Sequence, residues 1–207
     1  NSSTVTTLLV VSFISGGMMT LAQSVGVIMG ANIGSTVTAQ LLAFNLSEYS
    51  LGPVAAGFFM MYSAKRERTK YYGMMLMGIG LVFYGMGLMS SSMTPLRSFE
   101  PFLDVLAAME NPAMGILAGA LFTAVVQSSA ATVGIAIAMA SEGLLALPAG
   151  IALALGANIG TAVTTAFMGI LSSKSTDAVR ASVVHVVFNV VGVLIWLPLI
   201  WLLVDIA

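Results

Sequence analysis

The sequence predicts an all-α polytopic membrane protein built from two inverted-topology repeats with re-entrant helical hairpins and discontinuous spanning helices. The first observation behind this prediction is composition: 58% of the 207 residues are hydrophobic, 7% are charged, and the mean hydropathy is +1.02. A soluble domain would hold about 25% charged residues, so this composition excludes a soluble globular protein. The net charge of −1 gives no indication of a nucleic-acid partner, and the chain has no cysteine for a disulfide or thiolate metal site.

The second observation is an internal duplication. The segment Gly-Ala-Asn-Ile-Gly occurs at residues 30–34 and again at residues 156–160, an offset of 126 residues. The same offset aligns Asn1-Ser2-Ser3 with Gln127-Ser128-Ser129. Because repeats define an architecture before single residues are interpreted, we divide the chain into repeat 1, residues 1–70, and repeat 2, residues 71–207. Repeat 2 starts near Tyr71, so a complete repeat 1 would begin about 55 residues before Asn1.

Repeat 1 begins with a short apolar segment, residues 4–14, which is shorter than the roughly 20 residues of a membrane span. Ser15-Gly16-Gly17 ends it. Residues 18–44 are long enough to span, but they contain many glycines and polar side chains, including Gln23, Asn32 and Gln40. We therefore expect a discontinuous helix whose open backbone lines a cavity. Another span is expected from residue 51 to about residue 64.

Repeat 2 shows the same order. We expect a span over residues 71–89 and a surface segment over residues 90–112. Two apolar arms, residues 113–126 and 130–141, flank Gln127-Ser128-Ser129, and each is too short to cross the hydrocarbon core. They predict a re-entrant hairpin. A second broken span follows over residues 144–170, and a last span over residues 181–204, interrupted at Pro198.

The third observation is the placement of charge. Four of the seven basic residues lie in the loop 65–70, which the positive-inside rule places in the cytoplasm. If residues 113–141 enter and leave on one side, the loop 172–180, with Lys174 and Arg180, is cytoplasmic too. Two full crossings would give the same orientation, and only the arm length favours the hairpin. Either way, the two copies have opposite orientations in the membrane, the plan of many secondary transporters.

The duplicated segments Asn1-Ser2-Ser3 and Gln127-Ser128-Ser129, which we call the tips, have the chemistry of an anion site. Serine is a preferred N-cap residue, and the free N–H groups of a first helical turn carry about half a positive charge. Two such helix starts facing one another would bind an anion. No Lys or Arg lies near either tip in the sequence, so a multiply charged anion would need cations beside it.

Neutral oxygen ligands for a small alkali cation are available near the tips. We infer Na⁺ as a coupling ion from threonine hydroxyls and asparagine amides in these segments. Backbone carbonyls that lose their helical hydrogen bonds where the helix is interrupted at the glycines would add further ligands. No Asp or Glu falls inside the apolar arms, which makes proton coupling the weaker alternative. The candidate sodium ligands are Thr6, Asn32, Thr36, Thr132, Asn158, Thr161 and Thr164.

These motifs resemble the sodium-dependent inorganic phosphate cotransporters of the type II and bacterial Na/Pi group. That family carries a duplicated Gln-Ser-Ser-Ser tip, each followed by Gly-Ala-Asn-Ile-Gly-Thr, and the resemblance covers nearly the whole chain. It implies symport of phosphate with Na⁺ in a cell membrane, without enzymatic activity. The implied phosphate-binding residues are Asn1, Ser2, Ser3, Gln127, Ser128 and Ser129.

The sequence departs from the family pattern at both tips. Asn1 stands where the family has glutamine, and Thr4 and Ala130 replace the third serine. The resemblance also leaves open a homo-oligomer and a cytoplasmic PhoU-like domain after the membrane part, which occurs in bacterial relatives.

Other interpretations remain. The glycines also form a small-xxx-small pattern that packs helices closely, and the serines could be simple helix caps. His185, one turn before Asn189, could be a packing residue or a partner of Ser128 or Ser129 in an intramembrane hydrolase, although the serines lack a glycine elbow. A passive anion channel and a transporter of another small anion are the alternative functions.

Overall fold

The computed structural model describes residues 3–44, 46–93, 95, 98–173 and 175–206, and its described secondary structure is helical. Repeat 1 contributes α1 (Ser3–Ser15), α2 (Leu21–Ala43) and α3 (Leu51–Ser63), with a short 3-10 turn, η1 (Ser47–Tyr49), before α3. The other helices are α4 (Glu67–Met93), α5 (Glu100–Ala108), α6 (Pro112–Val126), α7 (Ser129–Ser141), α8 (Leu147–Ser172), α9 (Thr176–Trp196) and α10 (Ile200–Ile206).

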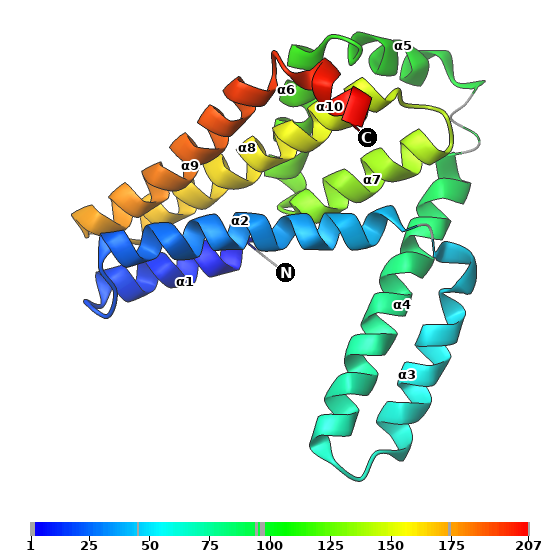
Figure 1. Ribbon diagram of the computed structural model, residues 1–207, viewed down its shortest axis with the longest axis horizontal. Coiled ribbons are helices and arrows are strands. Elements are labelled where there is room, and N and C mark those ends of the chain that lie inside the picture. Colours follow the sequence, from blue (N-terminus) through cyan, green and yellow to red (C-terminus); the bar gives the residue numbers. More distant parts are fainter. Residues whose placement is uncertain (1–2, 45, 94, 96–97, 174, 207) are drawn as a thin grey trace.

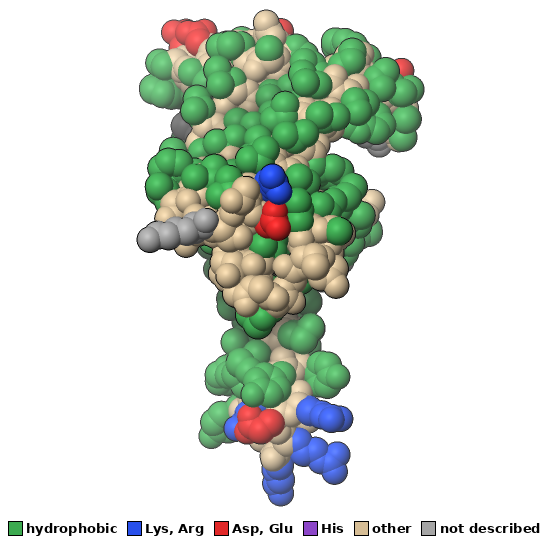
Figure 2. Space-filling model, turned by 90° about the vertical axis from the view of Figure 1, so that its left-hand side faces the viewer, with side chains coloured by type: hydrophobic (Ala, Val, Ile, Leu, Met, Phe, Trp, Pro, Cys, Tyr) green, Lys and Arg blue, Asp and Glu red, His purple; other side chains and the backbone are tan. Residues whose placement is uncertain are grey.

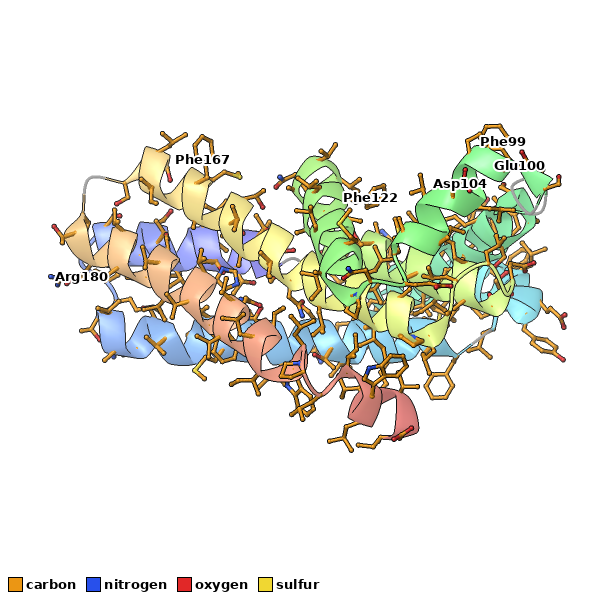
Figure 3. The ribbon with its side chains drawn as sticks, turned by 90° about the horizontal axis from the view of Figure 1, so that it is seen from above. Phe99, Glu100, Asp104, Phe122, Phe167 and Arg180 are labelled. Atoms are coloured by element: carbon orange, nitrogen blue, oxygen red, sulfur yellow. The ribbon has the colours of Figure 1, made fainter. Side chains whose placement is uncertain are left out.

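Three of the described helices, α4, α8 and α9, are long and apolar enough to cross a membrane. Large apolar side chains remain exposed on their outer faces, such as Phe167 on α8, which points away from the body in Figure 3. In water such surfaces would be costly, whereas lipid covers them without penalty. Composition and helices together identify a membrane protein.

The body of the molecule is organised around α8, which packs against α6, α7, α9 and α1 (Figure 1). Small residues make this possible, because Ala152, Ala157 and Ala162 are completely buried. At Gly156 and Gly160 the backbone of α6 lies so close that a Cβ atom would clash with the carbonyls of Ile116 and Ala120. The glycines therefore serve close helix packing.

The two Gly-Ala-Asn-Ile-Gly segments lie inside continuous helices, so the predicted discontinuous spans are wrong at these positions. α2 and α8 run without interruption through residues 30–34 and 156–160. Glycine lowers helix stability by about 1 kcal/mol relative to alanine, but backbone hydrogen bonds are needed in lipid and close packing at Gly156 and Gly160 offsets this cost. The last span is interrupted near Pro198 as predicted, since α9 ends at Trp196 and α10 begins at Ile200.

The duplication is visible in local structure. The helices α1 and α7 have equivalent bounds at the offset of 126, and α2 and α8 start at equivalent residues. Between them, Gly17 and Gly143 both have φ of +70°. In each copy the residue after this glycine donates its N–H to the carbonyl five residues earlier, which is the Schellman arrangement at a helix end.

The third helices of the two copies differ in their packing. α9 lies along α8, α1 and α2, whereas α3 packs against α4 and forms with it an arm that projects from the body (Figure 1). Glycines bring the arm's helices together: a Cβ at Gly73 would lie 2.8 Å from the Met61 nitrogen. Figure 2 shows basic side chains at the tip of this arm, where the sequence places the loop 65–70.

The surface segment predicted over residues 90–112 contains α5, which meets α6 at an angle of 112°. Leu106 is buried, while Glu100 and Asp104 are exposed. In Figure 3 these two acidic residues lie at the opposite end of the molecule from Arg180. Lys174, the other basic residue of the loop 172–180, lies outside the described residues, and which side of a membrane each end faces stays a prediction.

Candidate functional site

The tip between α6 and α7 is a tight turn at Gln127 and Ser128, where the sequence predicts the end of a hairpin. Gln127 is left-handed, with φ of 60°, and its side-chain amide donates to the Ala124 carbonyl at 2.6 Å. Ser128 is the N-cap of α7, since its hydroxyl oxygen accepts the Ala131 N–H at 3.2 Å. The two arms match the predicted apolar arms to within one residue.

A small cavity of about 60 Å³ lies at this tip and is lined by residues from both copies of the duplication. Ser3 and Thr4, at the start of α1, face Gln127, Ser128 and Ser129 across it. The space is large enough for water molecules. For the described residues, the two tips therefore meet as predicted. Ala130 and Thr161 complete the lining of the cavity. Asn1 and Ser2 lie outside the described residues.

A larger cavity of about 510 Å³ lies beside the first and contains both asparagines of the duplicated segments. Asn32 comes from α2 and Asn158 from α8, and Thr36 lies one turn after Asn32. The amide nitrogen of Asn32 is inaccessible to solvent and has no hydrogen-bond partner among the described residues.

Ser129 and Ala130 line both cavities, so the first turn of α7 separates them. The helix start of α7 thus presents its N–H groups between a pocket formed by the serine tips and a pocket formed by the asparagines. Among the residues that the structure describes, no charged side chain lines either cavity. An anion there would be held by hydroxyls, amides and helix N–H groups without a fixed positive charge.

The predicted sodium ligands divide into two groups. Asn32, Thr36, Asn158 and Thr161 line a cavity. Thr6, Thr132 and Thr164 line neither. The Thr132 hydroxyl lies 2.6 Å from the Thr123 hydroxyl, and the Thr164 hydroxyl donates to the carbonyls of Gly160 and Thr161.

The expected supply of free carbonyls is not observed, because the helices continue through the glycines. The Thr161 hydroxyl donates to the Ala157 carbonyl at 3.0 Å, and the Thr36 hydroxyl donates to the Asn32 carbonyl at 3.3 Å. Each hydroxyl that donates in this way keeps its oxygen lone pairs for a cation. Hydroxyl and side-chain amide oxygens, not backbone carbonyls, are thus the available ligands.

Sequence reasoning left three polar residues out of the predicted site. Thr4 lines the small cavity, and Ser35 and Asn189 line the large one. Asn189 donates its amide to the His185 carbonyl at 2.8 Å. Its position inside an apolar span was the available signal. His185 is buried and lines neither cavity, so the structure does not bring it into the serine pocket.

Comparison with known proteins gives consistent matches. YqeW of Bacillus subtilis is 29% identical over 198 residues, which cover 95% of this chain and 64% of YqeW. YjbB of Escherichia coli, named as a candidate inorganic phosphate export protein, is 28% identical over 99% of this chain and 37% of its own length. Sodium-dependent phosphate transport protein 2A of Rattus norvegicus is 39% identical over 97 residues, 45% of this chain and 15% of that protein.

The chain therefore spans only part of the length of these relatives. No solved structure matches it. The family described as Na⁺/Pi-cotransporter matches residues 1–91 and 98–200, nearly the whole chain. This is a family of transporters and not of enzymes, and the chain belongs to it.

Proposed function

We propose that the protein moves inorganic phosphate across a cell membrane in a step coupled to Na⁺. The observation that carries the proposal is the small cavity in which Ser3 and Thr4 of one copy face Gln127, Ser128 and Ser129 of the other. The family membership and the names of two relatives support the choice of phosphate as the anion.

Phosphate would bind at the start of α7. Four features there suit a tetrahedral oxyanion: serine hydroxyls from both copies, the Gln127 amide, the positive end of the α7 dipole, and a lining without acidic groups among the described residues. The proposed phosphate-binding residues are therefore Ser3, Gln127, Ser128 and Ser129, together with Asn1 and Ser2, which directly precede Ser3 in the sequence.

Sodium would bind where neutral oxygens lie closest to that anion. Asn32, Thr36, Asn158 and Thr161 line the two cavities that the first turn of α7 separates. Since no lysine or arginine of the described part of the chain lines them, a bound phosphate would keep most of its charge, and nearby cations would lower the energy of the loaded site. This gives a physical reason for coupling. Thr132 and Thr164 are assigned to the surrounding hydrogen bonds rather than to the ion. Thr6 lines neither cavity and is not assigned to the ion either.

We further propose that the two copies are inverted in the membrane and that the α6–α7 hairpin is re-entrant. The arms of α6 and α7 hold 15 and 13 residues, about 20 Å each as helices. The basic tip of the α3–α4 arm and the loop 172–180 would then face the cytoplasm. Such an arrangement allows each copy to open toward a different side.

The proposal is tested by phosphate binding to the purified full-length protein in Na⁺ and in K⁺ at equal ionic strength. Phosphate should bind with much higher affinity in Na⁺. Equal affinity in both salts would remove sodium from the site, and binding of sulfate in place of phosphate would assign another anion to the same fold.

A further inference from the structure

Three buried side-chain atoms have no hydrogen-bond partner among the described residues. They are the Thr7 hydroxyl oxygen on α1, the Asn32 amide nitrogen on α2 and the Nδ1 atom of His185 on α9. The side chains of Thr7 and His185 are almost completely buried, with exposed fractions of 0% and 1%. By contrast, the buried hydroxyl of Ser182 donates to the Ala178 carbonyl of its own helix at 3.2 Å. Since buried polar groups nearly always have a partner, the three unpaired atoms require an explanation.

The helix α1 is antiparallel to both α2 and α9, and the three helices pack against one another. α2 follows α1 after a tight turn and returns along it (Figure 1). The end of α1 lies beside the start of α9, because the Ser15 hydroxyl is 2.6 Å from the hydroxyl of Ser173, shortly before α9. A step toward the start of α1 is therefore a step toward the ends of α2 and α9.

The three unpaired atoms lie one helical turn beyond a shared apolar cluster. This cluster contains a buried residue from each helix: Val11 of α1, Ile28 of α2 and Ala181 of α9. Thr7 is four positions before the α1 member, and Asn32 and His185 are four positions after the other two. Residues four apart share a helix face. Because α1 is antiparallel to the other two helices, the three polar side chains form the next layer of the same interface.

The chemistry of this layer suits a water molecule. The Asn32 amide nitrogen only donates, the Thr7 hydroxyl donates and accepts, and Nδ1 of a neutral His185 accepts when Nε2 carries the hydrogen. One water that bonds to all three makes the three hydrogen bonds typical of a buried water. The amide hydrogens of Asn32 disfavour a cation. An anion would lack a basic partner, because α1, α2 and α8 contain no ionisable residue and Arg180 of α9 pairs with Asp177.

We infer that Thr7, Asn32 and His185 share one internal site, which holds a water molecule and fixes the Asn32 amide beside the large cavity. Asn32 lines that cavity, whereas its amide nitrogen is inaccessible to solvent. A hydrogen bond to this nitrogen holds the amide plane and so sets the direction of the amide oxygen. Thr7 and His185 are thus positioning residues for the sodium ligand Asn32, a role that rests on the proposed function.

A double-mutant cycle on thermal stability tests whether the side chains share one site. Thr7→Val and His185→Leu in the full-length protein should each lower the Tm, because each leaves buried polar atoms without a partner. Together they should lower it by less than the sum of the two shifts, since both remove bonds to the same water. Thr123→Val with Thr132→Val is the coupled control, because these hydroxyls are 2.6 Å apart. Thr7→Val with Ser50→Ala is the additive control, because the buried Ser50 directly precedes α3 in the arm.

Additive shifts for Thr7→Val and His185→Leu would overturn the inference. If His185→Leu does not fold, the cycle of Thr7→Val with Asn32→Leu makes the same prediction and decides in the same way. A structure of the full-length protein that shows ordered waters should have one within hydrogen-bond distance of all three side chains. Side chains that bond to one another directly, without a water, would also contradict the inference.

The positioning role is tested by the Na⁺ concentration needed for half-maximal phosphate binding. His185→Leu should raise this concentration severalfold. His185→Asn should keep it near the wild-type value, because asparagine carries a hydrogen-bonding atom on Cγ, where histidine carries Nδ1. Equal losses in the two variants would show that His185 only fills space. If wild-type phosphate binding proves independent of Na⁺, the proposed function fails, and the stability cycle alone decides whether the internal site exists.

Discussion

The Thr165 hydroxyl donates to the Thr4 hydroxyl at 3.3 Å, a bond that joins α8 of the second copy to α1 of the first. Thr165 is fully buried, and its hydroxyl also lies 2.6 Å from the Thr161 carbonyl. Thr4 and Thr161 both line the small cavity. The two halves of the proposed phosphate site are thus held in register by a polar contact outside the space that the ion would occupy.

Replacing Ser129 by alanine should weaken phosphate binding, because Ser129 lines both cavities at the start of α7. A hydrogen bond to a charged group contributes about 1.5–3 kcal/mol, so we expect a loss of affinity of about tenfold or more. The matched control is Ser141→Ala at the opposite end of the same helix, where the hydroxyl donates to the Ala138 carbonyl. Equal phosphate affinity in the two variants would remove Ser129 from the site.

Substitutions of Gln127 distinguish the effect of backbone strain at the tip from the effect of ligand binding. Its left-handed conformation costs an L-residue about 1–2 kcal/mol, which glycine does not incur. Gln127→Gly should therefore keep or raise the Tm, while losing the amide that lies against the proposed anion. Gln127→Val should lower the Tm, because a β-branched residue is strongly disfavoured at φ of 60°. A Gln127→Gly variant with unchanged phosphate affinity would show that the amide has only a structural role.

Asn158 and Thr164 lie on the same helix and are both predicted from the sequence as sodium ligands, but only Asn158 lines a cavity. Asn158→Ala should raise the Na⁺ concentration needed for half-maximal phosphate binding by about tenfold, equivalent to 1.4 kcal/mol. Thr164→Ala should leave it nearly unchanged, since Thr164 lines neither cavity. The reverse order of effects would place the ion on the other side of α8.

Gly156→Ala should destabilise the protein, because the added Cβ would clash with the Ile116 carbonyl on α6. Overpacking of this kind costs about 1–3 kcal/mol. The comparison is Gly78→Ala in α4, where nothing lies within 4 Å and the change should be neutral or stabilising by up to about 1 kcal/mol. Thermal unfolding in detergent measures both, and a Tm for Gly156→Ala at or above the wild type would contradict the packing role.

Periodicity and length predicted the helices of this protein because short apolar arms and polar turns have strong local signatures. The helical arms on either side of Gln127 and the end of α1 before Gly17 follow the prediction closely. Ser3 and Ser128 line one cavity, as expected from the duplication together with the transporter plan in which the binding site lies where two inverted repeats meet.

The glycine segments show where local reasoning failed. A glycine inside a membrane helix can open the backbone or allow a neighbouring helix to approach, and the sequence is the same in both cases. At Gly156 the decisive fact is the position of α6, a tertiary contact that no local pattern contains. The separation of α3 from the body was missed for the same reason, because its partner α4 belongs to the next repeat.

The measurement that tests the central claim most directly is labelled phosphate flux in liposomes containing the full-length protein, under a Na⁺ gradient and under an equal K⁺ gradient. Both gradient directions are needed, since one relative is named for export. We expect phosphate to accumulate against its own gradient only with Na⁺, and Ser129→Ala to lose this accumulation while Ser141→Ala keeps it. Phosphate that merely equilibrates in either salt would contradict coupling and assign a passive anion channel to this fold.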